Sequence, residues 1–163
     1  AGELELYMKV DARMLIEELQ KMHSKAMGWI FIQELRIGTG YGPGKEQRLD
    51  AWAINAWTLR SGKNRTSNIR RAFEVKVSRS DVQNELRNPD KRWHAYAVSH
   101  EFYFVAPAGL IRLAELDKDD GLIEWTGTDL KIAKPARVRE SMPPRWSFVV
   151  SIARRVNEVT NGL

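Results

Sequence analysis

A glutamate and a lysine stand two residues apart in the stretch RAFEVKVSRSD, residues 71–81. Successive side chains of a β-strand point to opposite faces of the sheet, so Glu74 and Lys76 share one face, opposite to the apolar side chains around them. Two interpretations are open. The pair can be a solvated salt bridge, or it can belong to a metal-dependent phosphodiesterase site, in which acids hold the ion and a separate cation assists the reaction.

Asp50 supplies a second acid for such a site. It lies near the start of a predicted strand, 48–59, and if that strand neighbours the strand of Glu74, the two carboxylates meet at one end of the sheet. Two carboxylates and the backbone carbonyl of Val75 form the hard oxygen set that Mg²⁺ or Mn²⁺ prefers. Lys76 would orient the attacking water or balance charge in the transition state. The plain alternative is a surface Glu–Lys pair and an unrelated aspartate.

Hydrophobic periodicity and capping residues predict the elements that must position these side chains. They are a helix over 11–27 with Asp11 as N-cap, strands over 29–37, 48–59 and 69–77, a helix over 78–88 capped by Ser78 or Ser80, a second helix from Asp90 to about Ser99, strands over 101–107, 121–126 and 129–134, and a closing helix after Pro144. The glycine-rich segment 38–47 and the polar segment 60–68 are predicted turns. Turns favour an antiparallel meander, and the helical connection lets the fourth strand lie parallel to the third. The predicted fold class is therefore α/β, an αβββαβ core with a mixed sheet flanked by helices.

The composition limits the class of protein further. The chain has 163 residues, of which 43% are hydrophobic and 29% are charged, which is typical of one globular domain over 1–163. It contains no cysteine, and its three histidines lack the spacing of a zinc site, so any metal would be held by carboxylates. No apolar run is long enough for a membrane span, and the acidic N-terminus is not typical of a signal peptide. We expect a cytoplasmic protein with no membrane partner.

Basic residues favour an anionic partner, because the net charge is +5 and the segment from 60 to 71 holds no acid. Such clusters neutralise backbone phosphates of nucleic acid. Each residue can equally be a solvated surface charge, but together they favour DNA. The predicted DNA contacts are Lys63, Arg65, Arg70, Arg71 and, in the helical region that follows, Lys91.

The same residues resemble a known superfamily. Asp50 followed by Glu74-Val75-Lys76 on this strand order resembles the PD-(D/E)XK nucleases. The linked runs EVKVSRSD, DKRWHAY, FYFVAPAGLI and DDGLIEW, within about 33–137, resemble the MmcB-like DNA-repair family of that superfamily. The resemblance implies a restriction-endonuclease-like fold and divalent-metal hydrolysis of DNA, with the aspartate, the glutamate and the lysine in the catalytic positions.

The resemblance also directs attention to neighbouring positions. Leu49 stands where the superfamily often has a proline before the aspartate. Such nucleases often carry a further acidic ligand from the first helix, which makes Glu18 a candidate, and Glu34 on the first strand competes with it. Both also have a plain interpretation as surface charges.

The sequence therefore predicts a Mg²⁺- or Mn²⁺-dependent DNA endonuclease of repair or recombination, acting on branched or single-stranded DNA. It would be associated with the nucleoid, as a monomer or a homodimer. A non-catalytic DNA-binding module that keeps the nuclease fold is the alternative, and the intact acid–acid–lysine set argues against it. A sequence-specific restriction enzyme is disfavoured, because the chain shows no additional recognition domain.

Overall fold

The computed structural model describes residues 9–38, 47–61 and 64–162. Most of the predicted glycine-rich turn, 39–46, therefore lies outside the described residues. In chain order the elements are α1 (Ala12–Met22), the short 3-10 helix η1 (Lys25–Met27), β1 (Trp29–Arg36), β2 (Arg48–Asn55), β3 (Thr58–Ser61), β4 (Asn64–Ser67), β5 (Arg70–Val75), α2 (Arg79–Arg87), η2 (Pro89–Arg92), α3 (Trp93–Ala97), β6 (Glu101–Pro107), η3 (Leu113–Glu115), β7 (Gly121–Trp125), β8 (Leu130–Lys134) and α4 (Trp146–Asn161).

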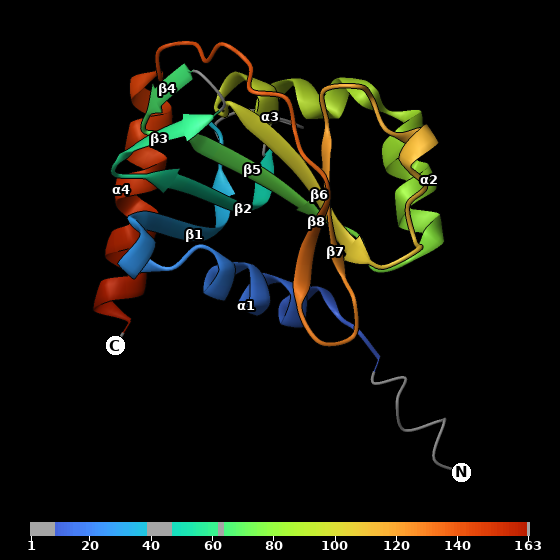
Figure 1. Cartoon of the computed structure of the whole chain (residues 1–163). Helices are drawn as coiled ribbons and strands as arrows, with labels where there is room; N and C mark the ends of the chain where they lie inside the picture. Colours follow the sequence, from blue (N-terminus) through green and yellow to red (C-terminus); the bar gives the residue numbers. More distant parts are fainter. Residues whose placement is uncertain (1–8, 39–46, 62–63, 163) are drawn as a thin grey trace.

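Six strands form one mixed sheet in the order β1-β2-β5-β6-β7-β8 (Figure 1). The strands β1, β2 and β5 are antiparallel neighbours, whereas β6 lies parallel to β5 and β7 lies parallel to β6. The change of direction has a simple cause, since short turns reverse the chain and the connection through α2 and α3 returns it to the same end of the sheet. The predicted α/β class is confirmed, and the elements of the main sheet follow the αβββαβ order, but the predicted strand 48–59 ends at Asn55 and the strands β3 and β4 are inserted before β5.

One face of the sheet is covered by α1. Asp11 caps this helix, because its Oδ1 accepts a hydrogen bond of 2.8 Å from the backbone N–H of Met14. Leu15 and Leu19 are fully buried and belong to the same apolar cluster as Phe73 of β5. The apolar side of α1 therefore packs against the face of β5 that carries Phe73.

The other face carries α2, α3 and α4. Val82 of α2, Ala95 of α3 and Phe148 of α4 share one buried cluster with Trp52 of β2. Because side chains alternate along a strand, the residues of β5 that flank Phe73 in sequence point to this second face. Within the described residues, none of the helices is long and apolar enough to cross a membrane.

The predicted turn over 60–68 instead contains most of a β-hairpin. Strands β3 and β4 pair antiparallel in a separate two-stranded sheet, with Thr58 opposite Ser67. The hydroxyl oxygens of these two residues lie 2.9 Å apart. The segment lacks an alternation of apolar and polar residues, the main strand signal in a sequence, so the prediction missed it. The hairpin follows Asn55, at the end of β2 remote from Asp50.

Candidate active site

Asp50 and Glu74 lie on one face at one end of the sheet. The antiparallel register pairs Ala51 with Phe73, and one further step places Asp50 opposite Glu74. Residues directly opposite in an antiparallel pair point to the same face. Asp50 is also fixed from β5 itself, since its Oδ2 accepts a 2.8 Å hydrogen bond from the N–H of Val75. The structure thus brings together the two acids that the sequence singled out.

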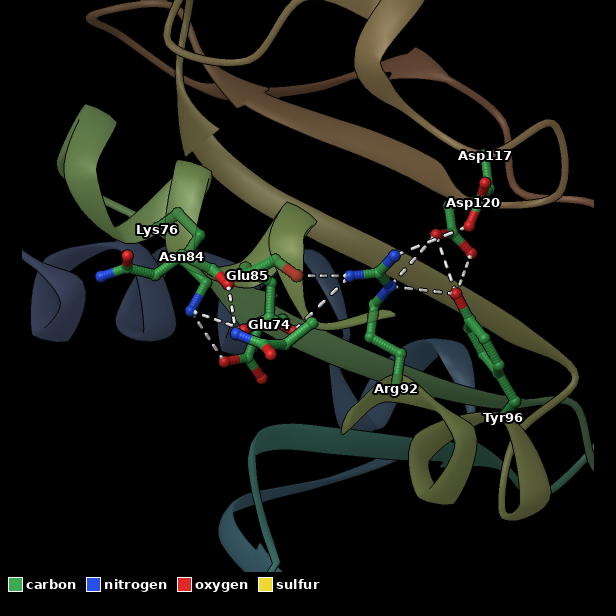
Figure 2. Close-up of polar contacts among 9 residues, drawn as sticks. Glu74, Lys76, Asn84, Glu85, Arg92, Tyr96, Asp117 and Asp120 are labelled. Carbon is green, nitrogen blue, oxygen red and sulfur yellow. Dashed lines mark hydrogen bonds and ion pairs between the residues drawn. The ribbon is translucent and has the colours of Figure 1, made fainter. Parts of the chain in front are cut away.

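Lys76 lies beside Glu74, just beyond the end of β5. Its Nζ is 3.1 Å from Oε1 of Glu74 and 3.3 Å from Oε2 of Glu85 on α2 (Figure 2). Its side chain is only 13% exposed. The backbone N–H of Lys76 donates to the carbonyl of Val105, which holds the position in register with β6. The lysine therefore stands between two carboxylates, on the face predicted from strand alternation.

These side chains open onto a groove, which we call the acidic groove. It has a volume of about 410 Å³, and Glu74, Lys76 and Glu85 line it. Three further basic residues line the same groove: Arg48 and Lys91, which are exposed, and Arg92, which is buried. An anionic ligand can therefore reach the carboxylates and lysine from solvent, with cations on the approach.

The surroundings of Glu74 and Asp50 disfavour the charged forms of both carboxylates. The pKa of Glu74 is raised to about 7, mainly by burial and then by the charge of Asp50, while Lys76 offsets part of the shift. Burial also raises the pKa of Asp50, against the hydrogen bond from Val75. For Lys76, burial lowers the pKa, but the carboxylates of Glu74 and Glu85 outweigh it and the net shift is upward. A cation at the acids would relieve the repulsion between them.

The donor set suits a hard divalent ion. The backbone N–H of Val75 points to Asp50 on β2. In a regular strand the N–H and the C=O of one residue face the same neighbouring strand. The carbonyl of Val75 therefore lies on the side of the two acids. Across the residues that the structure describes, no group of three or more His, Asp or Glu side chains could hold a metal ion. Two carboxylates and one carbonyl are therefore the candidate ligands, a set that would suit Mg²⁺, an ion that keeps several waters.

Glu74→Gln is predicted to stabilise the fold at alkaline pH and not at acidic pH. The pKa of Glu74 is about 7 in the folded protein, against an unperturbed value of 4.5. The parent protein therefore loses folding stability relative to the Glu74→Gln variant as the pH rises from 4.5 to about 7. Thermal unfolding midpoints at pH 4.5 and pH 8.5 measure the change, with the exposed Glu17→Gln as control. A midpoint difference between variant and parent that stays constant with pH would contradict the prediction.

Of the two candidate additional acids, the structure brings one towards the site. Glu18 lies on α1, which covers the opposite face of the sheet, and its Oε1 pairs with Nζ of Lys21 at 2.8 Å. Glu34 lies on β1 with a left-handed backbone (φ 51°), which is uncommon for a residue other than glycine. Its charge contributes to raising the pKa of Asp50. We therefore retain Glu34 as a candidate and withdraw Glu18.

Glu85 is the acid that the sequence analysis missed. It lies three residues after Val82 on the buried side of α2, and its side chain is 10% exposed. A signal was available, because residues spaced by three share one face of a helix. A charged residue on the apolar stripe of the crossover helix points at the same sheet face as Glu74.

A buried chain of alternating charges continues from Glu85 (Figure 2). The Arg92 guanidinium is 5% exposed, donates to the backbone carbonyl of Glu85 at 3.0 Å and lies 3.7 Å from Oδ2 of Asp120. Asp120 is fully buried and accepts hydrogen bonds of 2.9 Å from the hydroxyl of Tyr96 and 3.0 Å from Arg139. Lys76 is therefore linked, through Glu85 and Arg92, to Asp120 at the start of β7.

The predicted DNA contacts around the hairpin do not lie near the acids. Lys63 lies outside the described residues, and Arg65 is exposed on β4. The hairpin follows Asn55, and β2 spans roughly 17 Å from Asp50 to Asn55 at ~3.4 Å per residue. Arg65 is therefore at the opposite end of the sheet from the candidate site.

Arg70 and Arg71 have structural partners in place of the predicted phosphates. The Arg70 guanidinium donates to the carbonyl of Asn68 at 3.0 Å and lies 3.2 Å from Nε2 of His100. Arg71 is 17% exposed, and its Nε pairs with Glu101 at 2.9 Å. We withdraw both as DNA contacts: a phosphate that took Arg71 would leave the largely buried Glu101 unpaired, and the guanidinium of Arg70 is already engaged by Asn68 and His100. Lys91 remains a candidate on the rim of the acidic groove.

Comparisons with known proteins bear on the fold. No protein-family model matches the chain, and a search of curated proteins found no match. A solved structure, that of the SPO1766 protein of unknown function from Silicibacter pomeroyi, is similar with a TM-score of 0.57 and 19% sequence identity. The similarity covers 91% of this chain and 90% of that one. At this level of identity it shows that the two chains share a fold.

Proposed function

We propose that this chain is a divalent-metal-dependent DNA nuclease of the PD-(D/E)XK type, with a role in DNA repair or recombination like that of the MmcB-like family. The observation that carries the proposal is the placement of Asp50 opposite Glu74, with Lys76 on the same face of an open groove. The proposed protein acts at the nucleoid, as a monomer or a homodimer.

In this proposal the acids and the lysine have different roles. Asp50 and Glu74, with the carbonyl of Val75, would hold Mg²⁺ or Mn²⁺, which when bound polarises a phosphate and acidifies water. The N–H of Val75 fixes the orientation of the Asp50 carboxylate. Lys76 keeps its positive charge beside the reacting phosphate, and Glu85 holds the ammonium of Lys76 from the other side. A cation in this position stabilises the charge that develops on the phosphate oxygens.

The test is cleavage of labelled DNA in the presence and absence of metal. Duplex, single-stranded, flap and four-way-junction DNA are incubated with Mg²⁺, with Mn²⁺ or with EDTA. We expect cleavage of at least one substrate with either ion and none with EDTA. Binding of the same DNA should weaken steeply with salt, because contacts to phosphates release counterions. Binding that does not respond to salt, together with no cleavage, would remove nucleic acid from the proposal.

A non-catalytic DNA-binding module is the second candidate. It is favoured by the position of Lys76, whose ammonium is engaged by the carboxylates of both Glu74 and Glu85. A lysine held in this way can serve to neutralise buried acids and nothing more. The two candidates give different results in the assay above, since a binding module shows salt-dependent binding with no cleavage under either ion.

A further inference from the structure

A second groove, about 260 Å³ in volume, lies between β1 and α4. Four arginines line it against two glutamates, so its lining carries a positive excess. We call it the arginine groove and define it by Arg36, Arg48, Arg154 and Arg155. Figure 1 shows α4 alongside β1, at the edge of the sheet farthest from β8.

The arginine groove and the acidic groove share a lining residue. Arg48 lines both, and it stands two residues before Asp50 on β2. Glu34, whose charge acts on Asp50, lines the arginine groove from the neighbouring strand. A strand of nucleic acid whose phosphate reaches the carboxylates therefore has a lined path onward between β1 and α4.

The arginines are arranged as an anion site would require. Arg36 and Arg48 are directly opposite in the antiparallel register, so their side chains enter the groove from the same face of the sheet. Arg155 is held in place, since its Nε donates to the carbonyl of Gln33 at 2.9 Å. Arg154 is exposed, and among the described residues no carboxylate lies within ion-pair distance of it or of Arg48.

We propose that the arginine groove binds the phosphate backbone of the DNA strand whose scissile phosphate lies at Asp50 and Glu74. The inference rests on the proposed function, and it moves the main DNA contact from the hairpin at the far end of the sheet to the edge formed by β1 and α4. The guanidinium group suits this ligand, because its planar fork donates two parallel hydrogen bonds to phosphate oxygens.

The experiment measures the affinity for a fluorescent single-stranded oligonucleotide by anisotropy, in EDTA, across a series of salt concentrations. The variants are Arg48→Gln, Arg154→Gln and the double variant. The matched control is Lys131→Gln, which also removes one exposed positive charge but lies on β8, at the opposite edge of the sheet. Unfolding midpoints near that of the parent establish that each variant is folded.

Each arginine variant should bind several-fold more weakly, and the double variant should lower the salt slope by ~1.4, at ~0.7 per lost phosphate contact on single strands. Lys131→Gln should bind like the parent. The inference is overturned if the arginine variants bind as tightly as the parent, or if Lys131→Gln loses as much affinity as they do. In either case, cleavage by the parent would still support the proposed function. A parent that binds no DNA overturns both. Weakened binding in the arginine variants with no cleavage by the parent supports the groove and overturns the nuclease.

Discussion

Replacing Glu74 by glutamine is expected to slow phosphodiester cleavage by at least about 10²-fold while DNA binding is retained. Glutamine keeps the size and the hydrogen-bonding shape of the side chain but removes the charge that a divalent ion requires. DNA binding should persist or strengthen, because one negative charge is lost beside the phosphates and the basic surfaces are untouched. Cleavage rates with Mg²⁺ and Mn²⁺, and affinity by anisotropy in EDTA, measure the two effects separately.

Two neighbouring substitutions sharpen this prediction. Asp50→Asn should abolish cleavage in the same way and, like Glu74→Gln, should weaken binding of Mn²⁺ in calorimetry. Lys76→Ala should abolish cleavage but still bind the ion, since it leaves both carboxylates in place. The exposed Glu17→Gln serves as the control that should change neither activity nor metal affinity. If a folded Glu74→Gln variant cuts as fast as the parent under both ions, the site is misassigned and the binding-module candidate replaces the nuclease.

Arg92→Met is expected to lower the free energy of unfolding by about 3–5 kcal/mol. Methionine keeps much of the side-chain length, so the main effect is the loss of a buried cation between Glu85 and Asp120. The fully buried Asp120 then depends on Tyr96 and Arg139 alone. The free energy lost when one partner of a buried ion pair is removed exceeds the net stabilisation by the pair, because the remaining charge is buried without a partner.

Urea unfolding at pH 7 measures the effect of Arg92→Met. Arg87→Met is the matched control, because Arg87 is exposed in the last turn of α2 and forms no ion pair with the described residues. Surface substitutions of this kind change stability by about 0.5 kcal/mol or less. A midpoint for Arg92→Met equal to that of the control would mean that the ion pairs of Arg92 contribute nothing net to stability.

The relative placement of Asp50, Glu74 and Lys76 was predictable because it depends on local rules. Strand alternation alone puts Glu74 and Lys76 on one face, and short turns make the strand of Asp50 an antiparallel neighbour. The register then places the two acids opposite each other. Asp50 is thus brought to Glu74, 24 residues later in the sequence, and to Lys76 by properties that each segment carries by itself.

The surroundings of the site were less predictable because they depend on tertiary partners. Arg71 has the appearance of a surface cation in the sequence, yet Glu101, 30 residues later, pairs with it in a largely buried position. Arg65 belongs to a cluster that is basic in sequence but lies at the wrong end of the sheet. The spacing of Glu85 from Val82 indicates a buried helix face, but the contact of Glu85 with Lys76 depends on the packing of α2 over β5. Which charges are exposed, and where, follows from packing that no local pattern encodes.

The buried chain from Lys76 to Asp120 has a consequence for evolution. Each charge in the chain is paired with a neighbouring charge of opposite sign (Figure 2). A single neutral replacement therefore leaves a buried charge without its partner. Substitutions along the chain should therefore occur together in descent: lineages that lose the cation at Arg92 should also have lost an acid at Glu85 or Asp120. A set of homologous sequences in which position 92 varies independently of 85 and 120 would show that selection does not act on the balance.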